Sequence, residues 1–248
     1  MTPFQQLQYA FAQFRGEVCP SEPVEPVEVF DKLSSYPFYE QYAKKVAEML
    51  MACDPFVHLP FEDKWRLFRH AWPLVNHLER QFSSCELFGY NLEDQRMLMT
   101  KDVAIDFGRS QFVVDGMDPQ KLQEYMKFCF PLKQGMTEMI RTPMKQLQLT
   151  EFEVCYMVGL VVFSVTEVRG LSEETRIIGE QIADQFSSEL HNYYTYELKL
   201  KNYAARHAKL IRLISCAQQL NHTVKDHMVM AKIFDLFITD IYESELYE

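Results

Sequence analysis

The sequence has little glycine and lacks the patterns that mark most catalytic sites. Only 8 of its 248 residues are glycine, and the two-residue turns typical of tight β hairpins are missing, which argues against an all-β protein. There is no glycine-rich phosphate loop, no nucleophile elbow and no His-Glu-x-x-His pair. We therefore expect no cofactor and no enzymatic activity.

Positive charge is also scarce. The chain has a formal net charge of -10, which disfavours direct contact with nucleic acid because phosphate binding needs clustered Lys and Arg. No apolar run reaches transmembrane length, and residues 1–16 lack the core of a signal peptide. We expect no membrane contact.

The cysteines form no C-x-x-C pair. Four of the six lie inside apolar helical patterns: Cys85, Cys129, Cys155 and Cys216. This placement favours free buried thiols of an intracellular protein over disulfides.

A few isolated polar residues could still carry chemistry. Asp226 could ligate a metal with His222 or with His227, but a zinc site needs three or four convergent ligands, and solvated residues past a helix end are the better interpretation. Cys155 would need an oriented base to act as a nucleophile, yet its stretch is typical of a core helix. We expect no catalytic residue and no metal ligand.

One stretch, 59–85, has the features of a helix at the centre of a fold. Pro60, Glu62 and Asp63 mark a helix start. Apolar residues then recur every three or four positions along two adjacent rows. Only a narrow polar stripe is left for water, comprising Arg66, Arg69, His70, Asn76, His77 and Arg80. Because a helix that is apolar over most of its circumference normally packs between other layers, we expect this helix in the middle of the fold.

The segments before and after this helix are also mainly helical in pattern. We expect a first helix over 1–16, an acidic Pro-rich loop over 17–30 and a second helix over 38–50. After the central helix, apolar residues alternate around Asp102, which is compatible with a short β hairpin.

Capping signals divide the second half of the chain. Asp118 is expected to cap a helix that runs to about Phe130, and Pro131 to start another. Thr150 and Glu153 form a capping box ahead of a strongly apolar helix. From residue 177 a helical pattern runs almost unbroken to about residue 220. The whole chain, 1–248, is therefore expected to be one all-α domain with at most a short β hairpin.

The segment 59–72 resembles the signature of nuclear receptor ligand-binding domains, in which Leu-Pro, Asp-Gln, two apolar residues, a basic residue and a Trp recur at this spacing. Lys64 stands where the family usually has Gln. The segments 149–153 and 170–174 are similar to the starts of later helices in that family, and 234–248 is similar to its activation helix. The likeness covers about the whole chain and is strongest to the divergent branch expanded in nematodes. Because the paired Cys motifs of a DNA-binding domain are missing, we expect a ligand-binding domain alone.

The resemblance implies a three-layer antiparallel helical sandwich and a function in the nucleus as a regulator of transcription. In the family, an apolar ligand packs under the activation helix, which completes a groove for a Leu-rich helix of a coregulator. The chain has 13 Met and 19 Phe, which suit an adaptable binding interior but equally a Met-rich core. The alternative is a ligand-independent helical scaffold for dimerisation and interaction, with a filled core.

The resemblance places the coregulator groove on six residues: Ala47, Met51, Trp65, Arg69, Asp240 and Glu245. Arg69 corresponds to the basic residue that grips one end of the bound helix, with Trp65 on the groove floor. Met51 falls where the family has a lysine. The carboxylate at the other end of the bound helix depends on how the tail is aligned with the family's activation helix. It corresponds to Asp240 in one alignment and to Glu245 in another.

The resemblance also implies where a ligand binds. The expected pocket residues are Phe38, Tyr42, Val46, Met49, Trp72, Val75, Phe82, Met136, Met139, Ile140 and Cys216. The arginine that binds carboxylates in other members corresponds to Ser83, and Arg80 lies one turn short. We therefore expect a largely apolar ligand, a fatty acid held differently, or a pocket filled by side chains.

Finally, the family pairs its subunits through the tenth helix, which corresponds to about 194–220. Close isologous pairing needs a narrow apolar stripe flanked by charge. Such a stripe is formed by Ala204, Ala208, Ile211 and Ser215. We expect a homodimer or a heterodimer through this helix.

Overall fold

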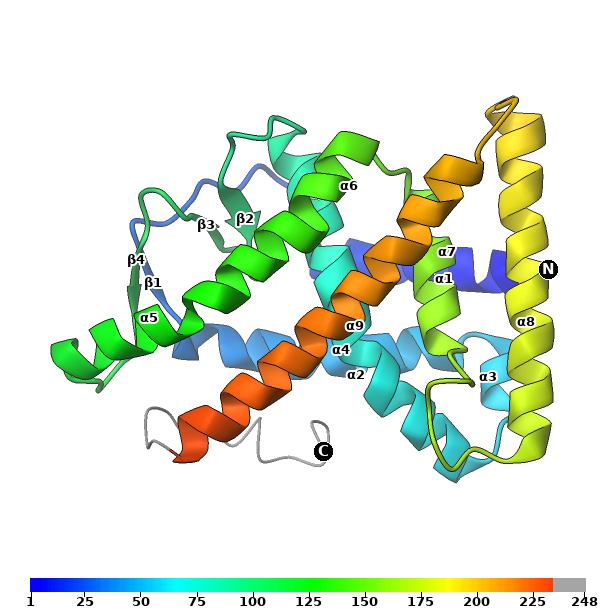
Figure 1. Cartoon of the computed structure of the whole chain (residues 1–248), viewed down its shortest axis with the longest axis horizontal. Coiled ribbons are helices and arrows are strands. Elements are labelled where there is room, and N and C mark those ends of the chain that lie inside the picture. Colours follow the sequence, from blue (N-terminus) through cyan, green and yellow to red (C-terminus); the bar gives the residue numbers. More distant parts are fainter. Residues whose placement is uncertain (234–248) are drawn as a thin grey trace. The chain divides into compact units, whose positions relative to one another are not determined.

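The computed structural model describes residues 1–233, and most of them are helical (Figure 1). The α-helices are α1 (Pro3–Val18), α2 (Tyr36–Met51), α3 (Asp54–Val57), α4 (Phe61–Phe88), α5 (Pro119–Gly135), α6 (Thr142–Leu147), α7 (Glu151–Val162), α8 (Glu173–Asn192) and α9 (Ala204–Ile233). Shorter turns are the 3-10 turn η1 (Leu33–Ser35) and the π-helical turns η2 (Met136–Arg141) and η3 (Tyr193–Glu197). The strands are β1 (Val29–Asp31), β2 (Arg96–Leu98), β3 (Ala104–Asp106) and β4 (Gln111–Val113). The expected activation helix, 234–248, lies outside the described residues.

The chain divides into two compact units. Unit 1 comprises Met1–Glu17, Ala43–Glu79 and Leu149–Ile214, and unit 2 comprises Val18–Tyr42, Arg80–Gln148 and the chain from residue 215 onward. Helices α2, α4 and α9 each contribute one part to unit 1 and the other to unit 2.

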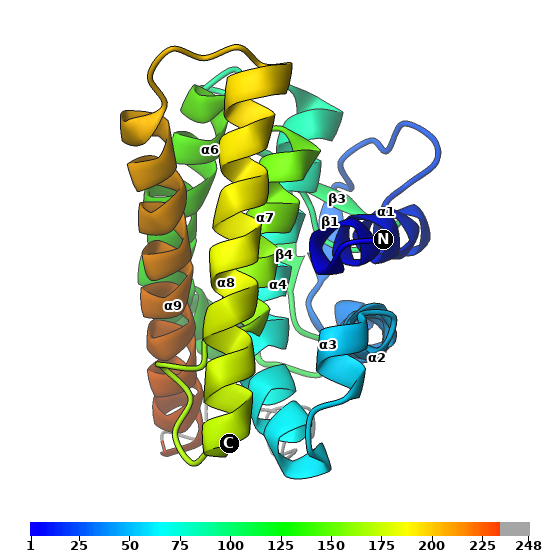
Figure 2. The ribbon, with the colours of Figure 1, turned by 90° about the vertical axis from the view of Figure 1, so that its right-hand side faces the viewer.

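The core of unit 1 is built around α7, which is buried along almost its whole length. The predicted capping box is confirmed, because Thr150 accepts from the Glu153 backbone and Glu153 accepts from the Thr150 backbone. Helix α1 runs across α7 and α8 (Figure 2). At this crossing the ring of Phe4 lies 4.9 Å from that of Phe152 and 5.1 Å from that of Phe186. Aromatic packing therefore joins three segments that are far apart in the sequence.

The start of α4 is anchored to the start of α8 and to the segment that precedes it. The buried carboxylate of Asp63 accepts hydrogen bonds from the hydroxyls of Ser172 (2.6 Å) and Thr175 (2.7 Å). Arg66 donates to the carbonyl of Gly170, which has a positive φ. Lys64, which replaces the usual Gln, donates to the Val57 carbonyl at 3.0 Å. These bonds fix the first turns of α4 within unit 1.

In unit 2, α5 lies beside the second half of α9. The ring centres of Phe128 and His227 are 4.7 Å apart, and a Cβ at Gly135 would lie 3.6 Å from Leu220. Asp118 caps α5 as predicted, since its side chain accepts from the backbone of two residues in the first turn.

The short hairpin expected around Asp102 is present as β2 and β3, an antiparallel pair. A second pair was not predicted: β1 and β4 pair in parallel. The Val27 backbone N–H also donates to the carbonyl of Ala104, at 2.9 Å. The end of the acidic Pro-rich segment is therefore held by strand-like pairing to residues that a local pattern cannot indicate.

Three local expectations were wrong. Helix α5 does not restart at Pro131 but runs through it to Gly135, because the fixed φ of proline is compatible with a helix at the loss of one hydrogen bond. The long pattern from residue 177 is interrupted after α8, where Lys199 takes a positive φ of 53° and α9 begins only at Ala204. No Gly or Pro signals this break. Arg80, expected to face water, is only 2% exposed.

Candidate functional site

Four of the six residues expected to form a coregulator groove, Ala47, Met51, Trp65 and Arg69, lie in unit 1 on α2 and α4. The other two, Asp240 and Glu245, lie outside the described residues. Trp65 and Arg69 are both half-buried, and the Arg69 guanidinium lies 6.0 Å from the centre of the Trp65 ring. The Trp65 ring stacks on Phe68 with centroids 5.9 Å apart. Because the start of α4 is anchored, this pair combines a half-buried aromatic ring with a cation over it in a fixed position.

The α2 side of this region is apolar at its end. Ala47 is half-buried and Met51, where the family has a lysine, is 49% exposed. Lys45 is engaged elsewhere, in ion pairs with Glu17 (2.5 Å) and Glu48 (2.8 Å). Hydrogen bonds to these two carboxylates raise the pKa of Lys45 to about 12. Of the groove positions proposed on α2 and α4, Arg69 is thus the basic one.

The residues expected to line a ligand pocket are all at least partly buried. The fully buried ones are Tyr42, Val46, Met49, Trp72, Val75, Phe82 and Ile140. The half-buried ones are Phe38, Met136, Met139 and Cys216. The pocket itself stays a prediction, and these residues belong partly to unit 1 and partly to unit 2.

Ser83 stands at the position of the family's carboxylate-binding arginine, in unit 2. Ser83 is buried, and its hydroxyl lies 3.2 Å from the Cys19 thiol. Arg80 also reaches Cys19, with Nη2 at 3.5 Å from Sγ. Its guanidinium lies 5.5 Å and 5.4 Å from the ring centres of Phe38 and Tyr42. The sequence could not place Arg80, since its burial depends on aromatic rings from α2.

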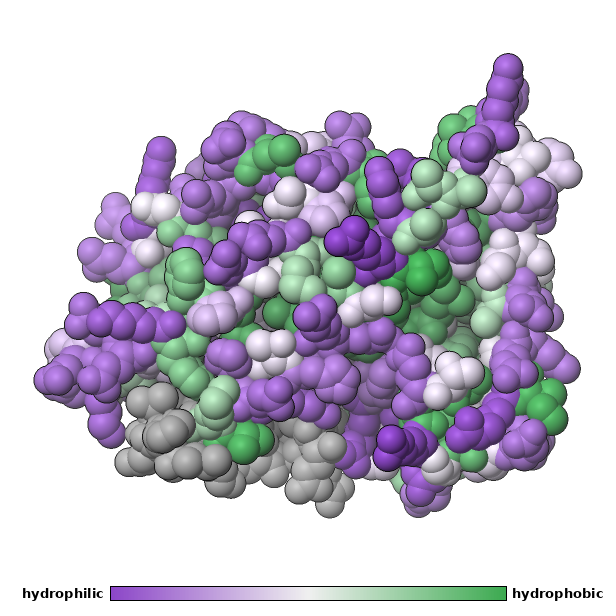
Figure 3. All heavy atoms as spheres, in the orientation of Figure 1, coloured by the Kyte–Doolittle hydropathy of each residue, from purple (hydrophilic) through white to green (hydrophobic). Residues whose placement is uncertain are grey.

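The stripe expected to mediate dimerisation lies on the surface of α9. Ala204, Ala208, Ile211 and Ser215 are all exposed. Figure 3 shows hydrophobic residues interspersed with hydrophilic ones over the first half of this helix. The opposite side of the same turns is buried at Leu210, Leu213 and Ile214.

Other residues considered for chemistry have ordinary structural environments. Cys155 is buried, and burial raises the pKa of its thiol well above the ordinary value, so it is a core residue. His222 and Asp226 are exposed on α9. Within the described part of the chain, no group of three His, Cys, Asp or Glu residues could hold a metal ion, and none of the helices described is long and apolar enough to cross a membrane.

The cations of unit 2 were missed by sequence analysis. Arg141 and Lys145 are 2% and 4% exposed, and Lys133 lies over the ring of Phe107. One signal in the sequence could have indicated that Arg141 is buried: it directly follows the apolar residues Met139 and Ile140 in a helical pattern.

Comparison with known proteins agrees with this architecture. Residues 20–234 match the family model described as the ligand-binding domain of nuclear hormone receptor. Similar Caenorhabditis elegans proteins include nuclear hormone receptor family member nhr-213, 22% identical over all of this chain and 60% of that protein. Another, nhr-54, is 24% identical over 87% of this chain and 53% of its own length. The high zinc activated nuclear receptor protein is 23% identical over 75% of this chain and 46% of its own length.

The chain belongs to the nuclear hormone receptor ligand-binding domain family, because the family model covers most of its length. The expected all-α fold of this type, with only short strands, is confirmed. The family consists of ligand-regulated transcription factors rather than enzymes. The chain spans about half to three-fifths of the length of the curated relatives it matches.

Proposed function

We propose that this chain is the ligand-binding and coregulator-recruiting domain of a receptor that regulates transcription in the nucleus in response to a small apolar ligand such as a fatty acid. A Leu-rich helix of a coregulator would lie against Trp65, with Arg69 binding the carbonyl groups at one end of that helix. With a net charge of -10, this domain is not expected to contact nucleic acid directly.

The observation that carries the proposal is the pairing of Trp65 and Arg69 one turn apart on an anchored helix. The Trp65 ring would give an apolar contact, and the guanidinium beside it would give charge-assisted hydrogen bonds of about 1.5–3 kcal/mol. Because Met51 stands where the family has a second basic residue, we expect only Arg69 among the α2 and α4 positions to bind the coregulator helix through a positive charge.

Peptide binding tests this proposal. Arg69→Glu should weaken the binding of a labelled Leu-rich helical peptide by about tenfold or more, measured by fluorescence anisotropy. The melting temperature should hardly change, since Arg69 is half-buried and makes no ion pair within the described residues. Lys201→Glu, in the exposed loop before α9, is a control for the change of charge. If Arg69→Glu binds every such peptide as the wild type does, the proposed groove is not used.

The tail supplies a second arm of the same experiment. Asp240→Lys should weaken peptide binding if Asp240 is the carboxylate at the far end of the groove. Glu245→Lys should do so instead if the other alignment holds. Both residues lie outside the described part of the chain.

The alternative, a ligand-independent scaffold that pairs through α9, is favoured by the exposed stripe on that helix. Native mass spectrometry of the gently purified chain separates the two functions. A co-purified apolar adduct supports ligand binding, whereas a bare mass that persists after incubation with apolar ligands supports the scaffold.

A further inference from the structure

Two cationic side chains of unit 2 lie over one aromatic ring. Lys133 Nζ is 4.4 Å, and the guanidinium carbon of Arg141 is 5.3 Å, from the centre of the Phe107 ring. Lys133 is in α5 and Arg141 ends η2. Burial lowers the pKa of Lys133, and the neighbouring charge of Arg141 lowers it further. The two positive charges are therefore near enough to repel each other.

Arg141 is buried among neutral partners. Its Nε donates to Gln81 Oε1 at 2.8 Å, and its Nη2 lies 2.9 Å from the sulfur of Met97. Among residues 1–233 no carboxylate forms an ion pair with Arg141 or Lys133. A buried charge normally has a counter-ion, because removing it from water carries a large penalty.

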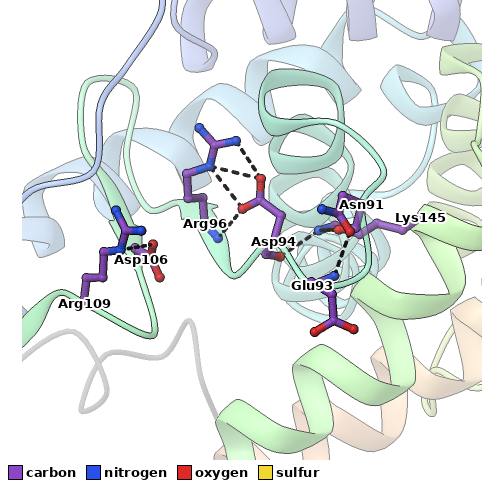
Figure 4. Close-up of polar contacts among 7 residues, drawn as sticks. All are labelled: Asn91, Glu93, Asp94, Arg96, Asp106, Arg109 and Lys145. Atoms are coloured by element: carbon purple, nitrogen blue, oxygen red, sulfur yellow. Dashed lines mark hydrogen bonds and ion pairs between the residues drawn. The ribbon is translucent and has the colours of Figure 1, made fainter.

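The nearby acids are already engaged by other arginines (Figure 4). Asp94 accepts from Arg96, with Nη2 2.6 Å from Oδ2 and Nε 3.1 Å from both oxygens. Asp106 lies 3.8 Å from Arg109. Lys145 donates to two backbone carbonyls of the same loop, at 2.7 and 2.8 Å. Both carboxylates are thus engaged by other arginines, and neither forms an ion pair with Arg141 or Lys133, while the charge of Asp94 acts on Arg141 only from a distance.

The surroundings of this cation pair are apolar. Phe107 belongs to a hydrophobic cluster centred on Phe30, Met97 and Ile105. Around that centre lie side chains that are only partly buried, namely Val27, Met99, Val103, Phe107, Phe112 and Met136. The region thus combines two positive charges with partly exposed apolar surface, which complements a molecule that carries an anionic group on an apolar chain.

We propose that Lys133 and Arg141 bind the headgroup of a fatty carboxylate, whose apolar chain packs against Phe107, Phe112 and Met136. A planar carboxylate can accept hydrogen bonds from a guanidinium and an ammonium together. Neither cation lies on α4, where the family resemblance places the headgroup arginine. The inference rests on the proposed ligand-binding function and makes it more specific, since an uncharged apolar ligand would leave both cations unpaired.

Isothermal titration of the whole chain with decanoate and with decanol tests the headgroup site. The two probes share an apolar chain and differ in charge. The wild type should bind decanoate about tenfold or more tightly than decanol. Lys133→Gln, at a half-buried position, should lower the affinity for decanoate about tenfold and leave that for decanol unchanged. Lys127→Gln, at an exposed position of the same helix, is the matched control and should behave as the wild type.

The outcomes separate this site from the proposed function on which it rests. Equal affinity for decanoate and decanol, or unchanged decanoate binding by Lys133→Gln, overturns the headgroup site while ligand binding itself stands. If neither probe binds, the headgroup site and the proposed fatty ligand fall together. Circular dichroism of each variant establishes that it is folded before its affinity is compared.

Discussion

The buried carboxylate of Glu153 forms a salt bridge with the half-buried Arg206 within unit 1. Arg206 donates to both carboxylate oxygens of Glu153, with Nη2 2.7 Å from Oε2. The Glu153 side chain is fully buried, and it also accepts from the hydroxyl of Tyr194 at 2.5 Å. Burial would raise the pKa of Glu153, but the hydrogen bonds from Arg206 and Tyr194 outweigh this and hold the pKa below its ordinary value. One carboxylate thus joins α7, η3 and the start of α9.

Replacing this carboxylate should strongly destabilise the fold. Glu153→Gln keeps the side-chain size but leaves Arg206 without its anion, which should lower the free energy of unfolding by about 2–4 kcal/mol. Urea denaturation followed by circular dichroism measures the change. Glu180→Gln, at an exposed position on α8, is the control and should have little effect. A loss below about 0.5 kcal/mol in Glu153→Gln would show that the salt bridge contributes little.

His77 on α4 should make stability fall in mild acid. Burial lowers its pKa from 6.5 to about 4, and its Nε2 has no hydrogen-bond partner within the described residues. Above pH 6.5 both the folded and the unfolded states hold it neutral. Between pH 6.5 and 4 mainly the unfolded state takes up the proton, so stability should fall by about 3 kcal/mol as the pH is lowered.

The histidine is tested by replacement. His77→Gln should remove this part of the pH dependence in urea titrations between pH 6.5 and 4. His222→Gln, which removes an exposed histidine of α9, should retain it. The same pH slope in His77→Gln as in the wild type would mean that other groups cause the acid sensitivity.

Gly159 should not tolerate a side chain. A Cβ at this position of α7 would overlap the ring of Phe186 and lie 3.0 Å from Leu7. Gly159→Ala should therefore lower the free energy of unfolding by about 1–3 kcal/mol, despite the better helix propensity of alanine. Gly16→Ala in α1, where nothing lies within 4 Å of the new Cβ, should instead leave stability unchanged or raise it by about 0.5–1 kcal/mol. Thermal denaturation should thus show a lower melting temperature for Gly159→Ala and no decrease for Gly16→Ala.

Self-association through α9 should depend on its exposed stripe. Ala208 is exposed in the middle of that stripe, and Ala208→Lys would place like charges at an isologous interface. Sedimentation equilibrium at tens of micromolar, a rough scale for weak dimers, should show a dimer for the wild type and a monomer for Ala208→Lys. Gln181→Lys, exposed on α8, should still dimerise. A wild-type monomer at that concentration would exclude this interface.

Local signals predicted several elements well. The Asp118 cap, the capping box at Thr150 and the hairpin around Asp102 were all expected from a few neighbouring residues. Each depends on hydrogen bonds or alternation within a short segment, so the sequence alone contains the information. The proposed groove stays a prediction, since it was placed by the family resemblance of the segment that contains Trp65 and Arg69.

Pairings between distant segments were not predictable in this way. The parallel pair of β1 and β4 joins Val29 to Gln111, and no pattern near Val29 indicates that partner. The break between α8 and α9 depends on the positive φ of Lys199, a conformation that lysine adopts only when its surroundings impose it.

The sequence by itself determined the helical class of this protein and the family to which the chain belongs, because periodicity, capping and a sequence signature are properties of short segments. Only the tertiary structure decided which cations are buried. Whether an arginine faces water depends on neighbours far along the chain, since its desolvation is offset by whatever the fold brings next to it. In the folded chain Arg80 lies over the rings of Phe38 and Tyr42. Arg141 lies over the ring of Phe107 and donates a hydrogen bond to Gln81. The charge that would select a ligand therefore arises from folding, not from any local motif.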